Sequence, residues 1–274
     1  MAKRLSIFAG QGQLVQSAIS SAVQSGYSIQ LLSLTDRADL DEFNPVSANI
    51  SNPISILLKL RSFKPTHICM VGGLSISDKQ REGLLGFLRG KSRRQRTTGD
   101  TGLSRLIGAL EFSTGAKVIG VHEIVPDLCA REGLLAGPEI SAQNLQDCAF
   151  ALKIAQEIGR LDIGQAVISS GQRIVGVEDI GGTDALMGRV KEFVAQGKIG
   201  NGRGTLILAK AKKPNQPATT DLPAIGPDTI LQAKASSVSI VCIEAENSLL
   251  IDKEKLFELA NKLDISVLGL RSEM

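Results

Sequence analysis

Short apolar runs alternate with helix-patterned segments through the first 120 residues, and this alternation constrains the fold more than any other feature. The first run, residues 4–9 (RLSIFA), meets a glycine turn, after which apolar residues recur at helical spacing over 14–23. The pattern then repeats, with strands expected at 29–34, 67–71 and 117–121 and helices at 53–63 and 101–112. Such alternation favours a doubly wound parallel sheet with right-handed crossovers.

The pattern changes after a long amphipathic helix expected at 143–158. Glycine-punctuated β-rich runs follow at 165–169, 173–178, 204–210 and 237–244, and then a helix at 253–263 and an apolar run at 265–270. A chain of 274 residues with 43% hydrophobic side chains can bury two modest cores. We predict a Rossmann-like α/β N-terminal domain with a parallel sheet (residues 1–133) and a distinct α/β C-terminal domain (residues 134–274).

Bulk properties favour a cytoplasmic protein over a membrane-spanning or secreted one. The longest apolar runs have strand length, well below the roughly 18 residues that a membrane span needs. The apolar run near the N-terminus breaks at Gly10, which is too early for a secretory signal. The four cysteines lack the spacing of a zinc site or a disulfide framework, so we expect reduced thiols.

Positive charge is concentrated at Arg89–Arg96 (RGKSRRQR), although the net charge of the chain is only +3. No aromatic residue is interleaved there, and the chain has no Trp and one Tyr, which argues against nucleic-acid binding by base stacking. A phosphate-rich ligand or an anionic membrane surface fits better. A solvated basic loop is the alternative.

A glycine turn, Gly10-Gln11-Gly12, follows the first expected strand. Its small residues allow backbone N–H groups and a helix N-terminus to face an anionic ligand. The third glycine of the dinucleotide fingerprint is absent, because position 15 is Val15, and Thr35-Asp36 only partly matches the ribose-binding acid. A ligand-binding turn and a structural turn both remain open, and an NAD-dependent oxidoreductase rests on this feature alone.

Carboxylates are the residues on which acid–base or metal chemistry would depend. The two histidines, His67 and His122, lie in or at the end of apolar runs, and no serine or cysteine has a histidine at a suggestive spacing. A Ser-His-Asp type of mechanism therefore has little support.

Polar residues gather in three blocks of the C-terminal half, at 161–167, 177–185 and 208–226. A helix that begins at a glycine pair would bind phosphate oxygens at its N-terminus, together with Lys210 or Lys213. Carboxylates in the same blocks would hold a divalent cation or orient water, and the ones concerned are Glu178, Asp184 and Asp221.

Two of these blocks also have a structural interpretation. Thr183 or Asp184 is a suitable N-cap for a helix that begins near Ala185. Asp221-Leu222-Pro223 is a suitable rigid turn.

Four segments resemble the hallmark segments of the LpxI family and occur in the same order along the chain: LDIGQAVI, VEDIGGTDAL, LAKAKKPNQ and TDLPAIGPDTI. In the N-terminal half, FAGQGQL resembles the opening glycine turn of the family, and Gly99-Asp100 before a helix resembles its GDD-leucine motif. The resemblance covers essentially the whole chain.

The resemblance implies hydrolysis of UDP-2,3-diacylglucosamine to 2,3-diacylglucosamine 1-phosphate (lipid X) and UMP, a step of lipid A biosynthesis that uses Mg²⁺. It also implies two domains that hold the lipid product between them, a homodimer, and peripheral contact with the inner membrane. No nucleic-acid partner is expected.

The essential aspartate of the family, in its D-[VL]-P-x-[IV]-G motif, falls on Asp221. Together with Glu178 and Asp184, it forms the expected metal-binding set. The substrate-binding residues that we expect are Gly10, Gly12, Asp100, Gln165, Gly182, Thr183, Asp184, Lys210, Lys213, Gly226 and Thr229.

The chain departs from the family pattern near the expected site. Gly181 stands where the family has an acid, Thr101 replaces the second acid of GDD, and 216–221 keeps only the first and last landmarks of Q-D-x-R-x-D. The alternative to the enzyme is therefore a catalytically impaired relative that binds lipid X or a nucleotide without turnover.

Overall fold

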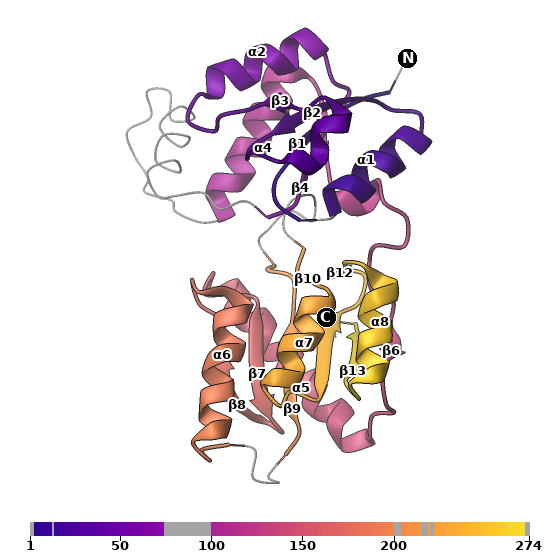
Figure 1. Cartoon of the computed structure of the whole chain (residues 1–274). Coiled ribbons are helices and arrows are strands. Elements are labelled where there is room, and N and C mark those ends of the chain that lie inside the picture. The colour runs from indigo at the N-terminus through magenta and orange to yellow at the C-terminus, as the bar shows by residue number, and fades with distance from the viewer. Residues whose placement is uncertain are drawn as a thin grey trace, which may run out of the picture. The chain divides into compact units, whose positions relative to one another are not determined.

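The computed structural model describes residues 3–12, 14–73, 100–199, 204–214, 219 and 222–271, and for 100–106 it describes the backbone alone. The chain folds into two compact units (Figure 1). The N-terminal unit runs to Pro126, and the C-terminal unit begins at Asp127. The boundary that we predicted after residue 133 falls inside strand β6 (Gly133–Ala136).

A five-stranded parallel sheet forms the centre of the N-terminal unit, with strand order β3-β2-β1-β4-β5. Its strands are β1 (Arg4–Ala9), β2 (Ser28–Ser33), β3 (Val46–Ser47), β4 (His67–Val71) and β5 (Lys117–Ile119). Among the described residues its helices are α1 (Leu14–Gln24), α2 (Pro53–Phe63) and α4 (Asp100–Thr114), with short 3₁₀ helices η1 (Ala38–Phe43) and η2 (Val121–Glu123).

Apolar side chains of α2 and α4 cover one face of this sheet. Ile56 and Leu60 of α2 pack in a buried cluster with Phe8 and Ile68 of the strands, and Ile107 and Leu110 of α4 join it. Helix α1 packs against β1, β2 and β4. The predicted parallel α/β arrangement of this domain is confirmed.

A six-stranded mixed sheet forms the centre of the C-terminal unit, with strand order β6-β13-β11-β9-β7-β8. Its strands after β6 are β7 (Ala166–Ser170), β8 (Arg173–Val177), β9 (Leu206–Lys210), β11 (Ile240–Glu244) and β13 (Ser266–Leu270). The remaining elements are α5 (Ala142–Arg160), α6 (Gly182–Ala195), α7 (Pro227–Ala235), α8 (Lys253–Lys262) and the two-stranded pair β10 (Ala224–Ile225) and β12 (Leu249–Leu250).

Helices cover both faces of the mixed sheet (Figure 1). On one face, buried side chains of α6, α7 and α8 pack on the strands, for example Leu186, Ile230 and Leu256. On the other face, α5 packs on the strands through Cys148, Ala151, Leu152, Ala155 and Ile158. The predicted distinct α/β C-terminal domain is confirmed.

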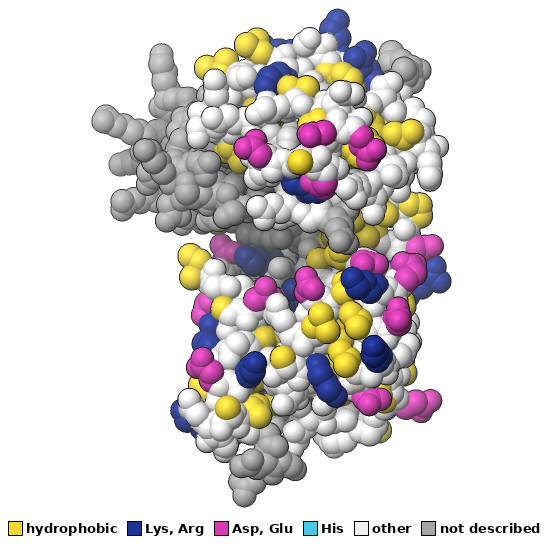
Figure 2. All heavy atoms as spheres, in the orientation of Figure 1, with side chains coloured by type: hydrophobic (Ala, Val, Ile, Leu, Met, Phe, Trp, Pro, Cys, Tyr) yellow, Lys and Arg dark blue, Asp and Glu magenta, His cyan; other side chains and the backbone are white. Residues whose placement is uncertain are grey.

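The face of the C-terminal unit formed by α6, α7 and α8 carries mixed charge (Figure 2). Basic and acidic side chains are interspersed there with apolar ones instead of gathering in one patch. Within the described ranges, every helix is too short or too polar to cross a membrane. The basic segment 89–96 lies outside the described residues.

Candidate functional site

The carboxyl edge of the parallel strands in the C-terminal sheet collects most of the predicted site residues. Strands β8, β9, β11 and β13 all end at this edge and β7 begins there, because β7 is antiparallel to β8 and β9 while β11 and β13 are parallel to β9. Lys210 at the end of β9 lies opposite Ala166 of β7 and Ile243 of β11. In open α/β sheets, ligands bind at this edge.

Glu178 is the central polar residue of this edge. Its carboxylate is buried, and its Oε2 accepts a hydrogen bond from the backbone N–H of Gln165 at 2.7 Å. Its Oε1 accepts a hydrogen bond from the Thr183 hydroxyl, also at 2.7 Å. Gly164 allows the two segments to meet, because a Cβ there would lie 2.5 Å from the Glu178 carbonyl oxygen. The structure therefore brings Gln165, Glu178 and Thr183 into direct contact.

Helix α6 begins at Gly182, with Gly181 as its N-cap and no side-chain capping bond. The predicted N-cap role of Thr183 or Asp184 is therefore wrong: Thr183 donates its hydroxyl proton to Glu178 instead, and Asp184 is exposed in the first turn. Gly182 has a left-handed backbone, with φ of 77°. The N-terminus of α6, with its positive end of the helix dipole, lies at the same edge.

Lys210 connects this edge to the segment that carries Gly226 and Thr229. The buried Lys210 ammonium donates to the carbonyl oxygen of Ala224 at 3.0 Å. Gly226 then caps α7, since its N–H donates to the Thr229 hydroxyl at 3.2 Å and its carbonyl accepts from the Thr229 N–H at 3.0 Å. The predicted binding residues Lys210, Gly226 and Thr229 are thus linked through the stretch 224–229.

Lys213 and Asp221 differ in how far the structure describes them. The Lys213 ammonium forms an ion pair with Asp162 at 2.7 Å, in the loop between α5 and β7. Asp221 lies outside the described residues, as do 215–218 and 220. Pro223, two positions later, accepts a hydrogen bond from the Leu249 N–H at 2.8 Å and is therefore anchored to the unit.

The remaining predicted residues belong to the N-terminal unit. Gly10 follows β1, and its N–H donates to the Val71 carbonyl at 2.8 Å, while Gln11 and Gly73 exchange two backbone hydrogen bonds. A Cβ on Gly10 would lie 2.5 Å from the Gly73 oxygen. Gly12 has φ of 106° with open space around it. Asp100 starts α4, and only its backbone is described.

Gly72 is as tightly placed as Gly10, and its replacement with alanine should disrupt the paired turns. A Cβ there would lie 2.3 Å from the Gln11 oxygen, and the φ of 89° strains any L side chain. Gly72→Ala is therefore expected to cost about 3 kcal/mol and to lower the melting temperature of the N-terminal unit by about 10 °C in calorimetry. Gly73→Ala is the matched control, because a Cβ at Gly73 meets nothing within 4 Å. Equal melting temperatures for the two variants would contradict this assignment.

Three functional candidates escaped the sequence analysis. Glu244 ends β11 as a second buried carboxylate of the carboxyl edge, and its Oε2 accepts from the Lys212 N–H at 2.8 Å. The signal for it was an acid at the end of a buried strand. Arg37 follows β2 and contacts the glycine turn, and Asp39 pairs with Arg37, but no sequence pattern marks this pairing.

Comparison with known proteins gives matches over both units. The model of the LpxI N-terminal domain matches residues 4–128, and the model of the LpxI C-terminal domain matches residues 131–268. A curated protein of Caulobacter vibrioides, named UDP-2,3-diacylglucosamine pyrophosphatase LpxI, is 30% identical over 275 aligned positions, which cover 97% of each chain.

Among solved structures, a UDP-glucose-4-epimerase from Stenotrophomonas maltophila with bound NAD and formylated UDP-arabinopyranose aligns at a TM-score of 0.34. The alignment has 9% identity and covers 98% of this chain and 78% of that chain. A likeness at this level carries no structural argument. On the domain matches and the full-length relative, the chain belongs to the LpxI family.

Proposed function

We propose that the chain hydrolyses UDP-2,3-diacylglucosamine to 2,3-diacylglucosamine 1-phosphate and UMP in lipid A biosynthesis. The observation that carries the proposal is its 30% identity, over 97% of both chains, to a protein named for this pyrophosphatase activity. The carboxyl edge of the C-terminal sheet supports it, because a buried lysine and the N-termini of α6 and α7 suit a diphosphate.

In the proposed reaction, water attacks the phosphorus on the sugar side of the diphosphate. The bond from that phosphorus to the bridging oxygen breaks, and UMP leaves with that oxygen. Asp221 orients the water and accepts its proton, while Lys210 and the two helix N-termini bind the diphosphate oxygens. Lys213, Gly226 and Thr229 shape the same edge, and the resemblance to the family supports Gly10 and Gly12 as further substrate-binding residues.

Magnesium dependence is part of the proposal and rests on the resemblance to the family and the charge of a diphosphate. In the described ranges, His, Cys, Asp and Glu side chains form no group of three or more placed to hold a metal ion. Each oxygen of the predicted ligand Glu178 accepts a hydrogen bond from the chain, so in this proposal Glu178 acts as a hydrogen-bond acceptor. Asp184 and Asp221 are the carboxylates that would hold Mg²⁺, which when bound neutralises diphosphate charge.

Removal of divalent cations tests this part of the proposal. EDTA is expected to lower the hydrolysis rate at least about a hundredfold, and added Mg²⁺ to restore it. A rate that stays the same in EDTA would rule out the metal requirement.

A genetic experiment tests the function in the cell. The chain should restore growth to a bacterium whose own UDP-2,3-diacylglucosamine pyrophosphatase is switched off, and Asp221→Ala should not. Failure of the wild-type chain, produced at a normal level, would contradict the enzyme proposal.

The second candidate function, binding of lipid X or a nucleotide without turnover, is favoured by the packing at Gly181. A Cβ at this position would lie 2.9 Å from the Ala185 Cβ, so the acid that the family has here would require a local shift. Lipid X that co-purifies with a chain unable to restore growth would support this candidate. The homodimer and the peripheral membrane contact remain predictions from the resemblance.

A further inference from the structure

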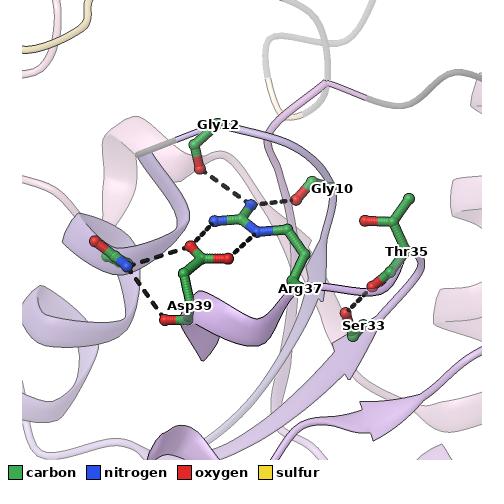
Figure 3. Close-up of polar contacts among 7 residues, drawn as sticks. Gly10, Gly12, Ser33, Thr35, Arg37 and Asp39 are labelled. Atoms are coloured by element: carbon green, nitrogen blue, oxygen red, sulfur yellow. Dashed lines mark hydrogen bonds and ion pairs between the residues drawn. The ribbon is translucent and has the colours of Figure 1, made fainter. Parts of the chain in front are cut away.

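Arg37, in the segment between β2 and η1, holds the carbonyl side of the glycine turn (Figure 3). Its Nη1 donates to the Gly10 oxygen at 2.6 Å and to the Gly12 oxygen at 3.2 Å. The Arg37 side chain is only 10% exposed. An arginine in this position fixes two carbonyl groups of the turn at once.

Asp39 holds the guanidinium in place. Arg37 Nε donates to Asp39 Oδ1 at 2.8 Å, and Nη2 donates to Oδ2. Gln16 of α1 donates in turn to the Asp39 carboxylate and backbone oxygen, both at 3.3 Å. The hydrogen bond from Arg37 lowers the pKa of Asp39 below its usual value, so the pair stays charged near neutral pH. Four of the five N–H donors of the guanidinium are engaged.

The amide side of the same turn is fixed by β4 and the residues after it. The N–H groups of Gly10 and Gln11 donate to the carbonyl oxygens of Val71 and Gly73, each at 2.8 Å. The turn is therefore held from both sides, by backbone on one and by the Arg37–Asp39 pair on the other. Groups held in this way reach a bound ligand without an ordering cost at the time of binding.

We infer that Arg37 is a positioning residue, which acts through the Gly10–Gly12 turn to hold it in the geometry that receives the nucleotide sugar. The inference rests on the proposed function in one respect, the assignment of Gly10 and Gly12 to substrate contact. Asp39 is the partner that holds the Arg37 guanidinium group in position. Neither side chain takes part in the bond-breaking step.

The Arg37→Lys variant tests the inference. Lysine keeps the positive charge but lacks the forked guanidinium group that joins two carbonyl groups and a carboxylate. The KM for UDP-2,3-diacylglucosamine is expected to rise about tenfold, with kcat within about threefold of wild type. The reason is that the turn binds the substrate and the transition state equally, so its distortion weakens both to the same extent. Arg131→Lys is the matched control, since Arg131 also pairs with a nearby aspartate, Asp127, but both side chains are exposed. Its KM and kcat should equal those of wild type.

Asp39→Asn is the second variant, with a smaller expected rise in KM because one acceptor oxygen remains. Unchanged KM in Arg37→Lys, or a fall in kcat alone, would overturn the inference. If Arg37→Lys does not fold, as judged by its melting temperature, Asp39→Asn decides: a raised KM supports the inference and an unchanged KM overturns it.

Equilibrium binding separates failure of this inference from failure of the proposed function. If the wild-type chain binds UDP in calorimetry but does not hydrolyse the lipid substrate, the proposed reaction is wrong. UDP affinity that is about tenfold weaker in Arg37→Lys than in Arg131→Lys then still supports the role of Arg37. Equal affinities, or no binding of UDP by any of the three proteins, overturn it.

Discussion

Replacing Asp221 with asparagine is expected to lower kcat for UDP-2,3-diacylglucosamine hydrolysis by about three orders of magnitude. Asparagine keeps the size of the side chain but cannot accept the proton of the attacking water or hold a cation as a carboxylate does. KM should change by no more than a few fold, since the diphosphate contacts that we assign to Lys210 and the helix N-termini remain. Steady-state kinetics with both proteins give the two values.

Asp264→Asn is the matched control for this substitution. Asp264 is exposed and precedes β13, so it lies at the opposite edge of the sheet from the proposed site, and asparagine tolerates its left-handed φ of 54°. Its kinetics should match those of wild type. An Asp221→Asn variant with more than about a tenth of wild-type kcat would exclude Asp221 as the catalytic carboxylate.

Truncation of Glu178 is expected to produce the largest loss of stability among the polar residues of the candidate site. Glu178→Ala leaves the Gln165 N–H and the Thr183 hydroxyl without their acceptor, and each unpaired buried group costs about 1–3 kcal/mol. The melting temperature of the C-terminal unit should fall by about 5–10 °C. Calorimetry is preferred to intrinsic fluorescence for this measurement, because the chain has no Trp and its one Tyr, Tyr27, lies in the other unit.

Glu178→Gln distinguishes a hydrogen-bond acceptor from a metal ligand. The amide keeps one acceptor oxygen but presents N–H groups to the second donor, so about half of the stability loss is expected. The Mg²⁺ concentration that gives half-maximal activity should stay within about twofold of wild type, whereas loss of a ligand would raise it about tenfold or more. The control is Glu157→Gln, since Glu157 pairs with Arg160 on the surface and should change the melting temperature little.

Sequence periodicity predicted the elements with long or strongly apolar patterns and missed the short ones. Residues 4–9, 53–63 and 67–71 form strand, helix and strand as predicted. The strand β6 was missed because four residues, GLLA, are too few to show alternation. Helix α7 was missed because Gly226-Pro227 marks a helix start as readily as a loop, and only nine residues follow.

The residues of the candidate site were partly predictable, but their contacts were not. Glu178 and Thr183 lie within five residues of each other, yet whether the Thr183 hydroxyl reaches the Glu178 carboxylate depends on the path of the chain into α6. The close approach at Gly10 requires Gly72 and Gly73, about sixty residues later in the chain, at the end of the neighbouring strand. Pairings over such separations follow from sheet order, which local patterns in one sequence do not specify.

The most direct test of the proposed reaction is incubation of the purified wild-type chain with UDP-2,3-diacylglucosamine and Mg²⁺ in H₂¹⁸O, with mass spectrometry of the products. We predict equal amounts of UMP and 2,3-diacylglucosamine 1-phosphate, with ¹⁸O in the phosphate of the lipid product. Label in UMP would show attack at the other phosphorus. A folded chain that releases neither product would contradict the proposed hydrolysis.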